Sequence, residues 1–307
     1  MCDRVAAEAR RRGPLLLDGP TGTELVRRGG PVHPVLWTAE AARRRPDLLA
    51  AVHRDYVTAG AEVLTANTFR TTAWAAAQAG HPHPEQEARA LLQASVALAR
   101  GAGAPFVAGS LAPLGDCYRP QDTPPEAVLD REHARTAAWL VAAGCDLVLC
   151  ETMGTAREAR AAVRAARAAG AEAWVSFLPA DDGAHLLGGD DLLAAARTAL
   201  ACGAAAVLVN CAHATVLERA LDVLAPLAAE GVVLGAYPNA ARMHQTPTGP
   251  VWEPDDRSEA EQAAAFAAFA QRWAARGVRL LGACCGATPA WIAALRQALN
   301  DSRRAGA

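Results

Sequence analysis

Eight short apolar runs recur along the chain, and within each run hydrophobic residues follow one another without the polar alternation of a half-exposed strand. Strands buried on both faces of a parallel sheet have this uninterrupted apolar character. We expect each run to form one such strand. The runs lie at residues 14–19, 62–69, 106–112, 147–151, 173–179, 206–212, 232–239 and 280–286.

The segments between these runs are rich in alanine, arginine and leucine and carry signals for helix starts. Thr155 with Glu158, and Ser258 with Glu261, have the spacing of a capping box. Eight strands that alternate with helices predict an α/β fold, a single (β/α)₈ TIM-type barrel. A doubly wound open sheet is the alternative, and the strand count favours the barrel.

No linker rich in proline, glycine or serine divides the chain. We therefore predict one barrel domain over residues 14–300, with an N-terminal extension at 1–13 and a C-terminal tail at 301–307. Three connections are longer than most loops between a strand and the next helix, which makes them candidates for the walls or lid of the barrel mouth. They are residues 20–37, 70–84 and 240–257.

Polar side chains gather where the predicted strands end, whereas the strand bodies contain almost none. Barrel enzymes place their active sites at this carboxyl-terminal face, so these side chains are the candidate site. They are Asp18, Asn67, Ser110, Glu151, Asn210, Cys211, Asn239, Cys284 and Cys285.

The charge balance limits the partners of the protein. The formal net charge is −2, and all 30 basic residues are arginine. This balance lacks the basic footprint of a nucleic-acid-binding protein, and the absence of lysine excludes a Schiff-base or general-base lysine. We therefore expect small-molecule partners and no nucleic acid, and the sequence predicts no particular oligomeric state.

The N-terminal residues and the cysteine spacing indicate a cellular location. Residues 1–13 lack the apolar core of a signal peptide, and no run of about 18 apolar residues suggests a membrane span. The eight cysteines are not spaced like the disulfide framework of a small secreted domain. We expect a cytoplasmic protein without a membrane partner, in which grouped cysteines are metal ligands or redox groups.

Three cysteines stand at the ends of two predicted strands. Cys211 closes the run at 206–212, and Cys284 and Cys285 close the run at 280–286. In an eight-stranded barrel only one strand lies between the two strands that these runs predict. We therefore expect the three sulfurs to lie within reach of each other at the mouth of the barrel. Three thiolates at one point form a Zn²⁺ site that leaves one position for a substrate.

Neighbouring side chains of a strand point to opposite faces, so Cys284 and Cys285 face one metal only if the backbone leaves strand geometry. Gly282 and Gly286 allow that departure. Two other interpretations are buried core thiols, since cysteine is among the most buried residue types, and a strained disulfide between the adjacent pair. His213 is a candidate fourth ligand if its strand continues, and a loop residue if the strand ends first.

A zinc ion with three thiolates carries a net charge of −1 and holds an added thiol in its ionised form. The bound sulfur then stays electron-rich, which suits attack on an alkyl carbon better than activation of water. The site therefore predicts alkyl transfer to a small thiol.

At these residues the sequence resembles the homocysteine S-methyltransferase family, from about residue 14 to residue 300. In that family two of the matching segments, VNC and the CC pair, carry the zinc ligands, which here are Cys211, Cys284 and Cys285. The resemblance implies a zinc-dependent enzyme that methylates homocysteine and forms methionine. The matching segments are LLLDGPTGTEL (15–25), TANTF (65–69), GSLAP (109–113), ET (151–152), VNC (209–211), YPN (237–239) and GACCGATP (282–289).

The resemblance also implies which residues bind the acceptor. Asp18 and Glu151 match acidic positions that hold the amino group of homocysteine, although a strand-end acid can also cap a loop or a helix. Gly22 and Thr23 lie in the loop expected to close over the amino acid, and their backbone amides can bind its carboxylate.

Four further residues complete the predicted site. Asn67, Asn210 and Asn239 are expected to hold loops or to orient the ligands, with a purely structural role as the alternative. Trp252 lies in the 240–257 connection and is predicted to offer its indole to a cationic methyl donor. It could instead only pack the connection onto the barrel rim.

Two segments depart from the family pattern. Pro20 stands where the family has a second glycine, and it removes an amide that could bind substrate. The stretch after YPN lacks the short Gly/Glu-containing segment of members that use sulfonium donors. Both departures lie in segments expected to contact the substrates, and the zinc-ligand segments are intact. The resemblance therefore implies zinc-dependent methyl transfer more strongly than it implies the identity of the methyl donor or of the thiol acceptor.

We expect a sulfonium donor, S-methylmethionine or S-adenosylmethionine, in preference to betaine or a folate. The chain is one barrel without cobalamin or folate modules, and its YPN segment resembles the sulfonium-using branch. A cationic donor is also attracted to an anionic zinc–thiolate site. The alternatives are the same transfer to another small thiol or selenol, a non-catalytic metal-binding or corrinoid-partner barrel, and a redox role for the adjacent cysteines.

Overall fold

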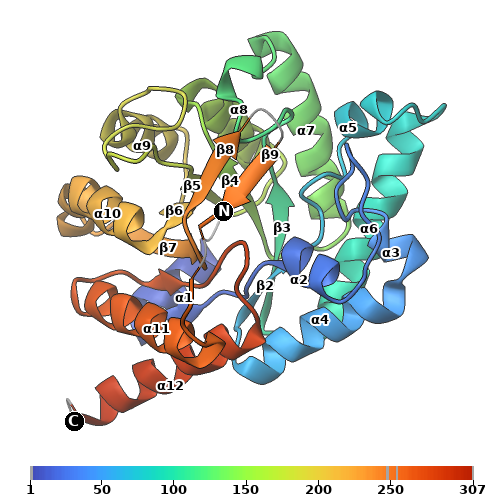
Figure 1. Cartoon of the computed structure of the whole chain (residues 1–307). Helices are drawn as coiled ribbons and strands as arrows, with labels where there is room; N and C mark the ends of the chain where they lie inside the picture. Colours follow the sequence, from blue (N-terminus) through green and yellow to red (C-terminus); the bar gives the residue numbers. More distant parts are fainter. Residues whose placement is uncertain (1–2, 247–248, 254, 306–307) are drawn as a thin grey trace.

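The computed structural model describes residues 3–246, 249–253 and 255–305, and it contains a closed parallel barrel (Figure 1). The strands follow the order β1-β10-β7-β6-β5-β4-β3-β2, and a bridge between Leu17 and Val63 joins the two edges. The predicted barrel is therefore confirmed. Its strands are β1 (Leu15–Leu16), β2 (Val63–Ala66), β3 (Phe106–Leu111), β4 (Leu147–Met153), β5 (Ala173–Phe177), β6 (Ala206–His213), β7 (Val233–Asn239) and β10 (Leu280–Leu281).

Helices surround the strands on the outside of the barrel (Figure 1). In the described part of the chain, no helix is long and apolar enough to cross a bilayer. The last helix continues beyond residue 300, into the segment that we treated as a tail. The outer helices are α4 (Pro46–Ala59), α6 (Pro84–Gly101), α7 (Glu126–Ala142), α8 (Ala156–Ala168), α9 (Leu192–Ala201), α10 (Ala214–Ala229), α11 (Glu259–Ala275) and α12 (Pro289–Ala305).

The continuous apolar runs are explained by burial on both faces of each strand. Leu147 and Leu149 pack inside the barrel, against Trp174 among others. Val148 and Cys150, which alternate with them along β4, pack against the surrounding helices. Because successive side chains of a strand point to opposite faces, a barrel covered by helices requires an apolar residue at nearly every strand position.

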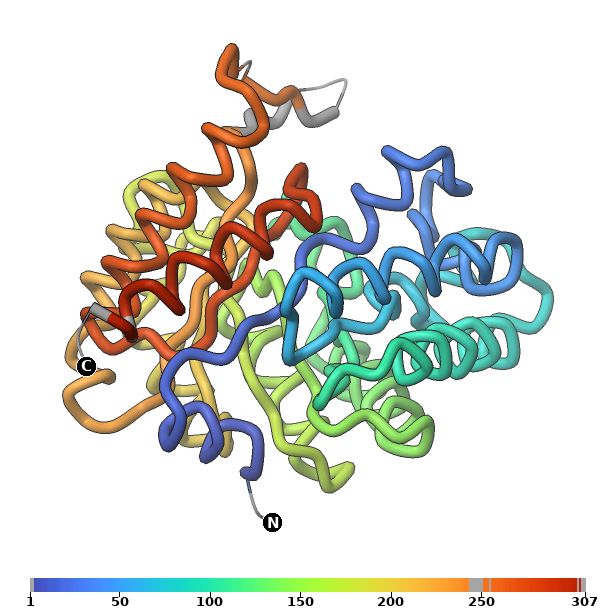
Figure 2. Tube along the Cα trace, turned by 90° about the horizontal axis from the view of Figure 1, so that it is seen from below, coloured from blue at the N-terminus to red at the C-terminus, as the bar shows by residue number. Residues whose placement is uncertain are grey.

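The first helix, α1 (Arg4–Arg12), lies beneath the barrel, at the end opposite residues 243–246 and 249–252 (Figure 2). Val5, Ala6 and Ala9 are fully buried in the apolar cluster inside the barrel. The Glu172 carboxylate accepts the backbone N–H groups of Val5 at 2.8 Å and Ala6 at 2.7 Å. The helix therefore closes the amino-terminal end of the barrel and leaves the other end for the site.

The predicted ends of the first and last strands are wrong, because β1 and β10 are only two residues long. A Cβ added at Gly282 would lie 2.6 Å from the Leu17 Cβ, so the chain after β10 passes very close to the chain after β1. The Ala283 N–H donates to the Asp18 carbonyl at 3.2 Å. Strand pairing with β7 therefore ends before the cysteine pair.

The long connections contain secondary structure that the sequence analysis did not predict. The connection after β1 contains α2 (Thr21–Arg27), and the one after β2 contains α5 (Ala73–Gln78). The connection after β7 contains an antiparallel hairpin of β8 (Met243–Thr246) and β9 (Gly249–Trp252). Pro250 lies within β9 and has no N–H to donate, which weakens the strand signal of this segment. Two short helical segments remain, α3 (Ala41–Arg44) and the 3₁₀ turn η1 (Pro120–Asp122).

Only one of the two predicted capping boxes is complete. Ser258 and Glu261 form both reciprocal bonds at the start of α11. At α8, Thr155 accepts the Glu158 N–H at 3.4 Å, but the Glu158 carboxylate accepts the Leu114 N–H at 2.9 Å instead of returning to the cap. A tertiary contact with Leu114 therefore replaces the bond from the Thr155 N–H to the Glu158 carboxylate that would complete this capping box.

Replacing Ser258 with alanine should lower the free energy of unfolding by about 1 kcal/mol, because the N–H of Glu261 loses its acceptor at the start of α11. Denaturant unfolding of the purified protein would measure this change. Glu261→Gln is the matched control, since glutamine can also return to the backbone of the cap. An unchanged unfolding midpoint in Ser258→Ala would contradict the role of the cap.

Candidate active site

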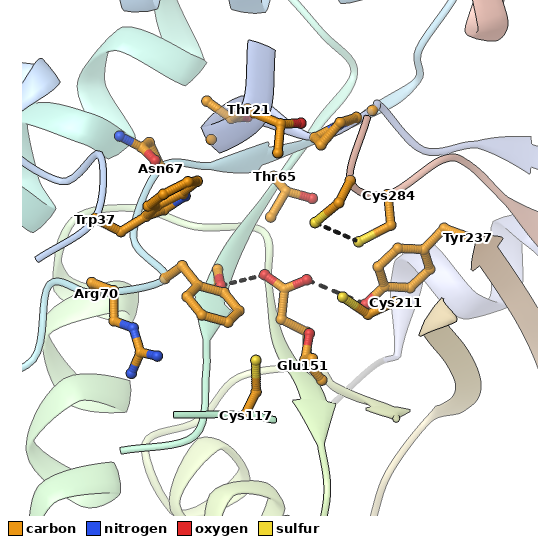
Figure 3. Close-up of a pocket in the computed structure, with 18 of the residues that line it drawn as sticks. Thr21, Trp37, Thr65, Asn67, Arg70, Cys117, Glu151, Cys211, Tyr237 and Cys284 are labelled. Atoms are coloured by element: carbon orange, nitrogen blue, oxygen red, sulfur yellow. Dashed lines mark hydrogen bonds between the residues drawn. The ribbon is translucent and has the colours of Figure 1, made fainter. Parts of the chain in front are cut away.

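A cavity of about 550 Å³ opens at the carboxyl ends of the barrel strands (Figure 3). Two residues of the predicted site, Asn210 and Asn239, lie outside its lining and are buried beside it. The others line it, and they are Asp18, Gly22, Thr23, Asn67, Ser110, Glu151, Cys211, Trp252, Cys284 and Cys285.

The three predicted ligand cysteines converge on one side of the cavity. The sulfur atoms of Cys211, Cys284 and Cys285 all lie within 4.8 Å of one another, and those of the adjacent pair are 3.9 Å apart. Tetrahedral ligands about 2.3 Å from a zinc ion lie roughly 3.8 Å from each other. The spacing of the three thiols therefore fits one metal ion bound between them.

Cys211 reaches this position through an unusual backbone conformation. Its φ angle is +61°, and the register of β6 against β7 shifts between Asn210 and His213. Thr152 has the same φ of +61° at a similar irregularity at the end of β4. Non-glycine residues rarely adopt this left-handed region, and they do so mainly where the surrounding structure requires it. The two irregularities end regular pairing where these strands meet the cavity.

The loop with the cysteine pair is held from both sides. The Cys284 N–H donates to the Pro238 carbonyl at 2.7 Å, and the Ala240 N–H donates to the Cys285 carbonyl at 2.9 Å. On the other side, the Gly286 N–H donates to the Thr23 hydroxyl at 3.1 Å. Gly286 has a φ of +85°, a conformation that glycine adopts without strain. These bonds fix the turn that directs both sulfurs to one point.

The structure bears on the alternative interpretations of these cysteines. Cys284 and Cys285 are free thiols in this structure. All three cysteines line the cavity, and Cys211 also packs in a small buried apolar cluster with Cys117 and Leu178. His213 caps the start of α10 by accepting the Thr215 N–H, and it is not part of the metal-binding group found among the described residues.

Two buried carboxylates face the same cavity. Glu151 accepts hydrogen bonds from the Ser110 hydroxyl and, at 3.3 Å, from the Tyr237 hydroxyl. Burial raises the pKa of Glu151 to about 6. The Asp18 carboxylate accepts the Thr65 N–H at 2.8 Å, and burial, aided by the charge of Glu151, raises its pKa well above the usual range.

Neither acid forms an ion pair with a described residue. Buried carboxylates without a cationic partner are unfavourable in their ionised form. A cationic ligand between Asp18 and Glu151 would stabilise both of them. This part of the cavity is therefore suited to an ammonium group.

The three asparagines connect segments around the cavity. Asn210 donates to the Thr152 hydroxyl at 2.9 Å and lies 4.0 Å from the Cys284 sulfur. Asn239 donates to the Cys211 carbonyl at 2.8 Å and so supports its left-handed conformation. Asn67 donates to the carbonyl of Thr38 at 2.9 Å and fastens the end of the connection after β1.

The connection after β1 forms another wall of the cavity. Pro20 is the N-cap of α2, and Gly22 lies in its first turn. A Cβ on Gly22 would lie only 2.3 Å from the indole nitrogen of Trp37, so any larger residue would displace that ring. Trp252, in β9, is 37% exposed and also lines the cavity.

The sequence analysis missed two tyrosines at the site. The Tyr118 hydroxyl lies 2.9 Å from the Cys211 sulfur, and the Tyr237 hydroxyl donates to Glu151. Tyr237 belongs to the YPN segment, which offered a signal. Tyr118 lies in a loop without periodicity, next to Cys117, a buried thiol of the cavity wall that is not among the three clustered cysteines.

Comparisons with known proteins agree with this geometry. The sequence profile of the homocysteine S-methyltransferase family matches residues 15–299. Homocysteine S-methyltransferase from Escherichia coli K12 is 33% identical over 305 residues, covering 92% of this chain and 94% of that protein. Homocysteine S-methyltransferase YbgG from Bacillus subtilis is 29% identical, over 90% of this chain and 91% of that protein.

A solved structure also covers nearly the whole chain. The metallated form of the homocysteine methyltransferase MmuM from E. coli superposes with a TM-score of 0.79 at 30% identity, covering 95% of this chain and 98% of that one. The sequence match and the structural match both extend across the barrel and its cysteine site. The chain belongs to the homocysteine S-methyltransferase family.

Proposed function

We propose that this protein transfers a methyl group from a sulfonium donor to the thiol of homocysteine, which forms methionine, at a zinc site made by Cys211, Cys284 and Cys285. The convergence of three thiols within 4.8 Å, in a cavity that also contains two buried carboxylates, carries this proposal. The sulfurs account for binding the reacting thiol, and the carboxylates account for binding an amino acid.

The donor set fits zinc in preference to a harder cation. Magnesium and calcium prefer oxygen ligands, whereas thiolates favour zinc and other soft metals. Bound zinc would lower the pKa of an incoming thiol and hold it as a thiolate. Asn210 lies 4.0 Å from the Cys284 sulfur, where its amide can orient that ligand.

Asp18 and Glu151 would hold the ammonium group of homocysteine. Both acids line the cavity, and the bonds from Thr65, Ser110 and Tyr237 hold them in place. The backbone amides of Gly22 and Thr23, in the first turn of α2, would receive the carboxylate. Pro20 supplies no such amide.

A sulfonium is the donor that this cavity favours. Asp18, Glu151 and three thiolates would give the metal-loaded site a net negative charge, which would attract a cationic donor. The positive charge of the sulfonium and the negative charge of the acceptor thiolate would then be neutralised as the methyl group is transferred. The donor would approach the acceptor sulfur within the same cavity, which Tyr118 and Trp252 also line.

A selenol acceptor is the second candidate. Selenocysteine Se-methyltransferase from Brassica oleracea is 26% identical to this chain, over 95% of the chain and 90% of that protein. Selenocysteine carries the same ammonium and carboxylate as homocysteine, and a selenol ionises more readily than a thiol. The same residues could therefore serve both acceptors.

Methionine formation by the purified, zinc-loaded protein tests the proposal. Homocysteine or selenocysteine would be offered with S-methylmethionine, S-adenosylmethionine or betaine, and the products identified by mass spectrometry. Methylated homocysteine with a sulfonium donor is the expected result. Transfer from betaine alone would refute the donor, and a preference for selenocysteine would favour the second acceptor.

Replacing Trp252 with alanine should weaken donor use and spare acceptor binding. A cation–π contact with a sulfonium contributes roughly 0.5–2 kcal/mol, so KM for the donor should rise about 2- to 30-fold. Steady-state kinetics with each substrate varied in turn would measure this, with Trp252→Phe as the control that keeps an aromatic face. An equal loss of affinity for both substrates, together with reduced stability, would show that Trp252 only packs the rim.

A further inference from the structure

One arginine at the cavity wall has no role in the proposed acceptor site. Among the described residues that line the cavity, Arg70 alone carries a positive charge. Figure 3 shows it across Glu151 from Cys211 and Cys284. The ammonium of homocysteine is matched by two acids and its carboxylate by backbone amides, so the Arg70 charge is left for another anionic group.

Arg70 is held in place by groups that do not neutralise it. One terminal nitrogen, Nη1, donates to the Gly115 carbonyl at 2.6 Å and to the Pro113 carbonyl at 3.4 Å. The guanidinium carbon lies 5.3 Å from the centre of the Phe69 ring. Its Nε and Nη2 groups donate to no described residue, and it forms no ion pair there. A guanidinium that is held in place and has free N–H donors is suited to binding a carboxylate through two parallel hydrogen bonds.

An acidic residue lies next to the segment that holds Arg70. Asp116 follows Gly115, lines the cavity and is exposed. Its Oδ1 accepts the Tyr118 N–H at 3.0 Å, which orients the carboxylate, and its Oδ2 accepts no hydrogen bond from a described residue. Arg70 and Asp116 do not pair with each other, so both charges remain available to a ligand.

We propose that Arg70 and Asp116 form a second amino-acid subsite, which binds the carboxylate and the ammonium of an amino-acid sulfonium donor. The inference rests on the proposed function and narrows its donor class. Sulfoniums with an amino-acid head, such as S-methylmethionine, bind at both charges. Sulfoniums that lack one of the two groups bind at only one.

Calorimetric binding to the zinc-loaded protein without homocysteine tests the subsite separately from turnover. Three probes are compared: S-methylmethionine with both groups, dimethylsulfoniopropionate with the carboxylate only, and (3-aminopropyl)dimethylsulfonium with the ammonium only. Arg70→Gln should weaken the first two at least about tenfold, as expected for a lost charge-assisted bond, and leave the third unchanged. Asp116→Asn should weaken the first and third and leave the second unchanged.

Arg70→Lys is the matched control, because it keeps the charge and loses the fork; its affinity for S-methylmethionine should lie between those of wild type and Arg70→Gln. Homocysteine affinity should be unchanged in all three variants. Equal losses for every probe, a loss confined to homocysteine, or no binding of S-methylmethionine to the wild type would each overturn the subsite. The predicted binding pattern without methionine formation would support the subsite and refute the proposed function.

Discussion

Replacing Cys285 with serine should abolish methyl transfer and lower the affinity of the protein for zinc. The Cys285 sulfur lies within 4.8 Å of both other thiols, so its loss leaves two thiolates and a weak hydroxyl ligand. We expect zinc affinity to fall by at least about a hundredfold, more than loss of a residue that only orients a ligand. Cys211→Ser and Cys284→Ser should behave alike.

Cys117 provides a matched control for this experiment. It lines the same cavity and is buried, but it does not belong to the cluster of three sulfurs. Burial raises the pKa of its thiol to about 12, so it stays protonated at neutral pH. Cys117→Ser should keep one zinc per chain, measured by elemental analysis after dialysis against a weak chelator. Full zinc content in Cys285→Ser with unchanged activity would refute the ligand assignment.

The sequence predicted the strands because their burial on both faces leaves a clear apolar pattern. It also predicted most of the polar residues that line the cavity, such as Asp18, Glu151 and Cys211, because residues that end the strands of such a barrel lie at its mouth. The exact strand ends were less predictable. Gly282 ends β10 through a close approach to Leu17, a contact between opposite ends of the chain that no local pattern records.

The loop contacts could not be predicted for the same reason. Gly22 packs against Trp37, Thr38 bonds to Asn67, and Arg70 bonds to the Gly115 carbonyl. Each contact depends on how a connection folds over the barrel, and apolar periodicity carries no information about that path. The left-handed conformation of Cys211 is also invisible in the sequence, because a residue with φ of +61° is more often glycine or asparagine.

Replacing Glu151 with glutamine should raise KM for homocysteine roughly tenfold or more and leave the zinc content unchanged. The carboxylate contributes a charge-assisted bond to the ammonium group, which is worth about 1.5–3 kcal/mol. Acceptors without the amino group should lose nothing in this variant, so comparing homocysteine with a simple alkyl thiol isolates the contact. If the alkyl thiol reacted as well as homocysteine in the wild type, the ammonium role of Glu151 would be wrong.

The same substitution should stabilise the protein without substrate. Burial raises the pKa of Glu151 from 4.5 to about 6 in the folded state, so folding favours its protonated form. The raised pKa adds to the free energy of unfolding fully below pH 4.5, and this gain is lost as pH rises through about 6. At pH 7.5 the buried group is ionised, which lowers the free energy of unfolding by about 2 kcal/mol relative to a neutral side chain. Glutamine is neutral and can still accept a bond from Ser110, so Glu151→Gln should unfold at higher denaturant concentration at pH 7.5.

Lowering the pH should change the two effects of Glu151 in opposite directions: it should weaken homocysteine use by the wild type and increase the stability of the wild type relative to Glu151→Gln. In the wild type, kcat/KM for homocysteine should fall as pH is lowered through about 6, because the protonated acid no longer attracts the ammonium. Over the same range the stability advantage of Glu151→Gln should shrink, since the wild-type acid becomes neutral as well. The variant should lack the part of this fall that Glu151 causes, and a fall caused by Asp18, whose pKa burial also raises, should remain. A variant that is less stable than the wild type at pH 7.5 would contradict the unfavourable burial of the ionised carboxylate. A variant that keeps the pH profile of the wild type would show that protonation of Glu151 is not what weakens homocysteine use at low pH.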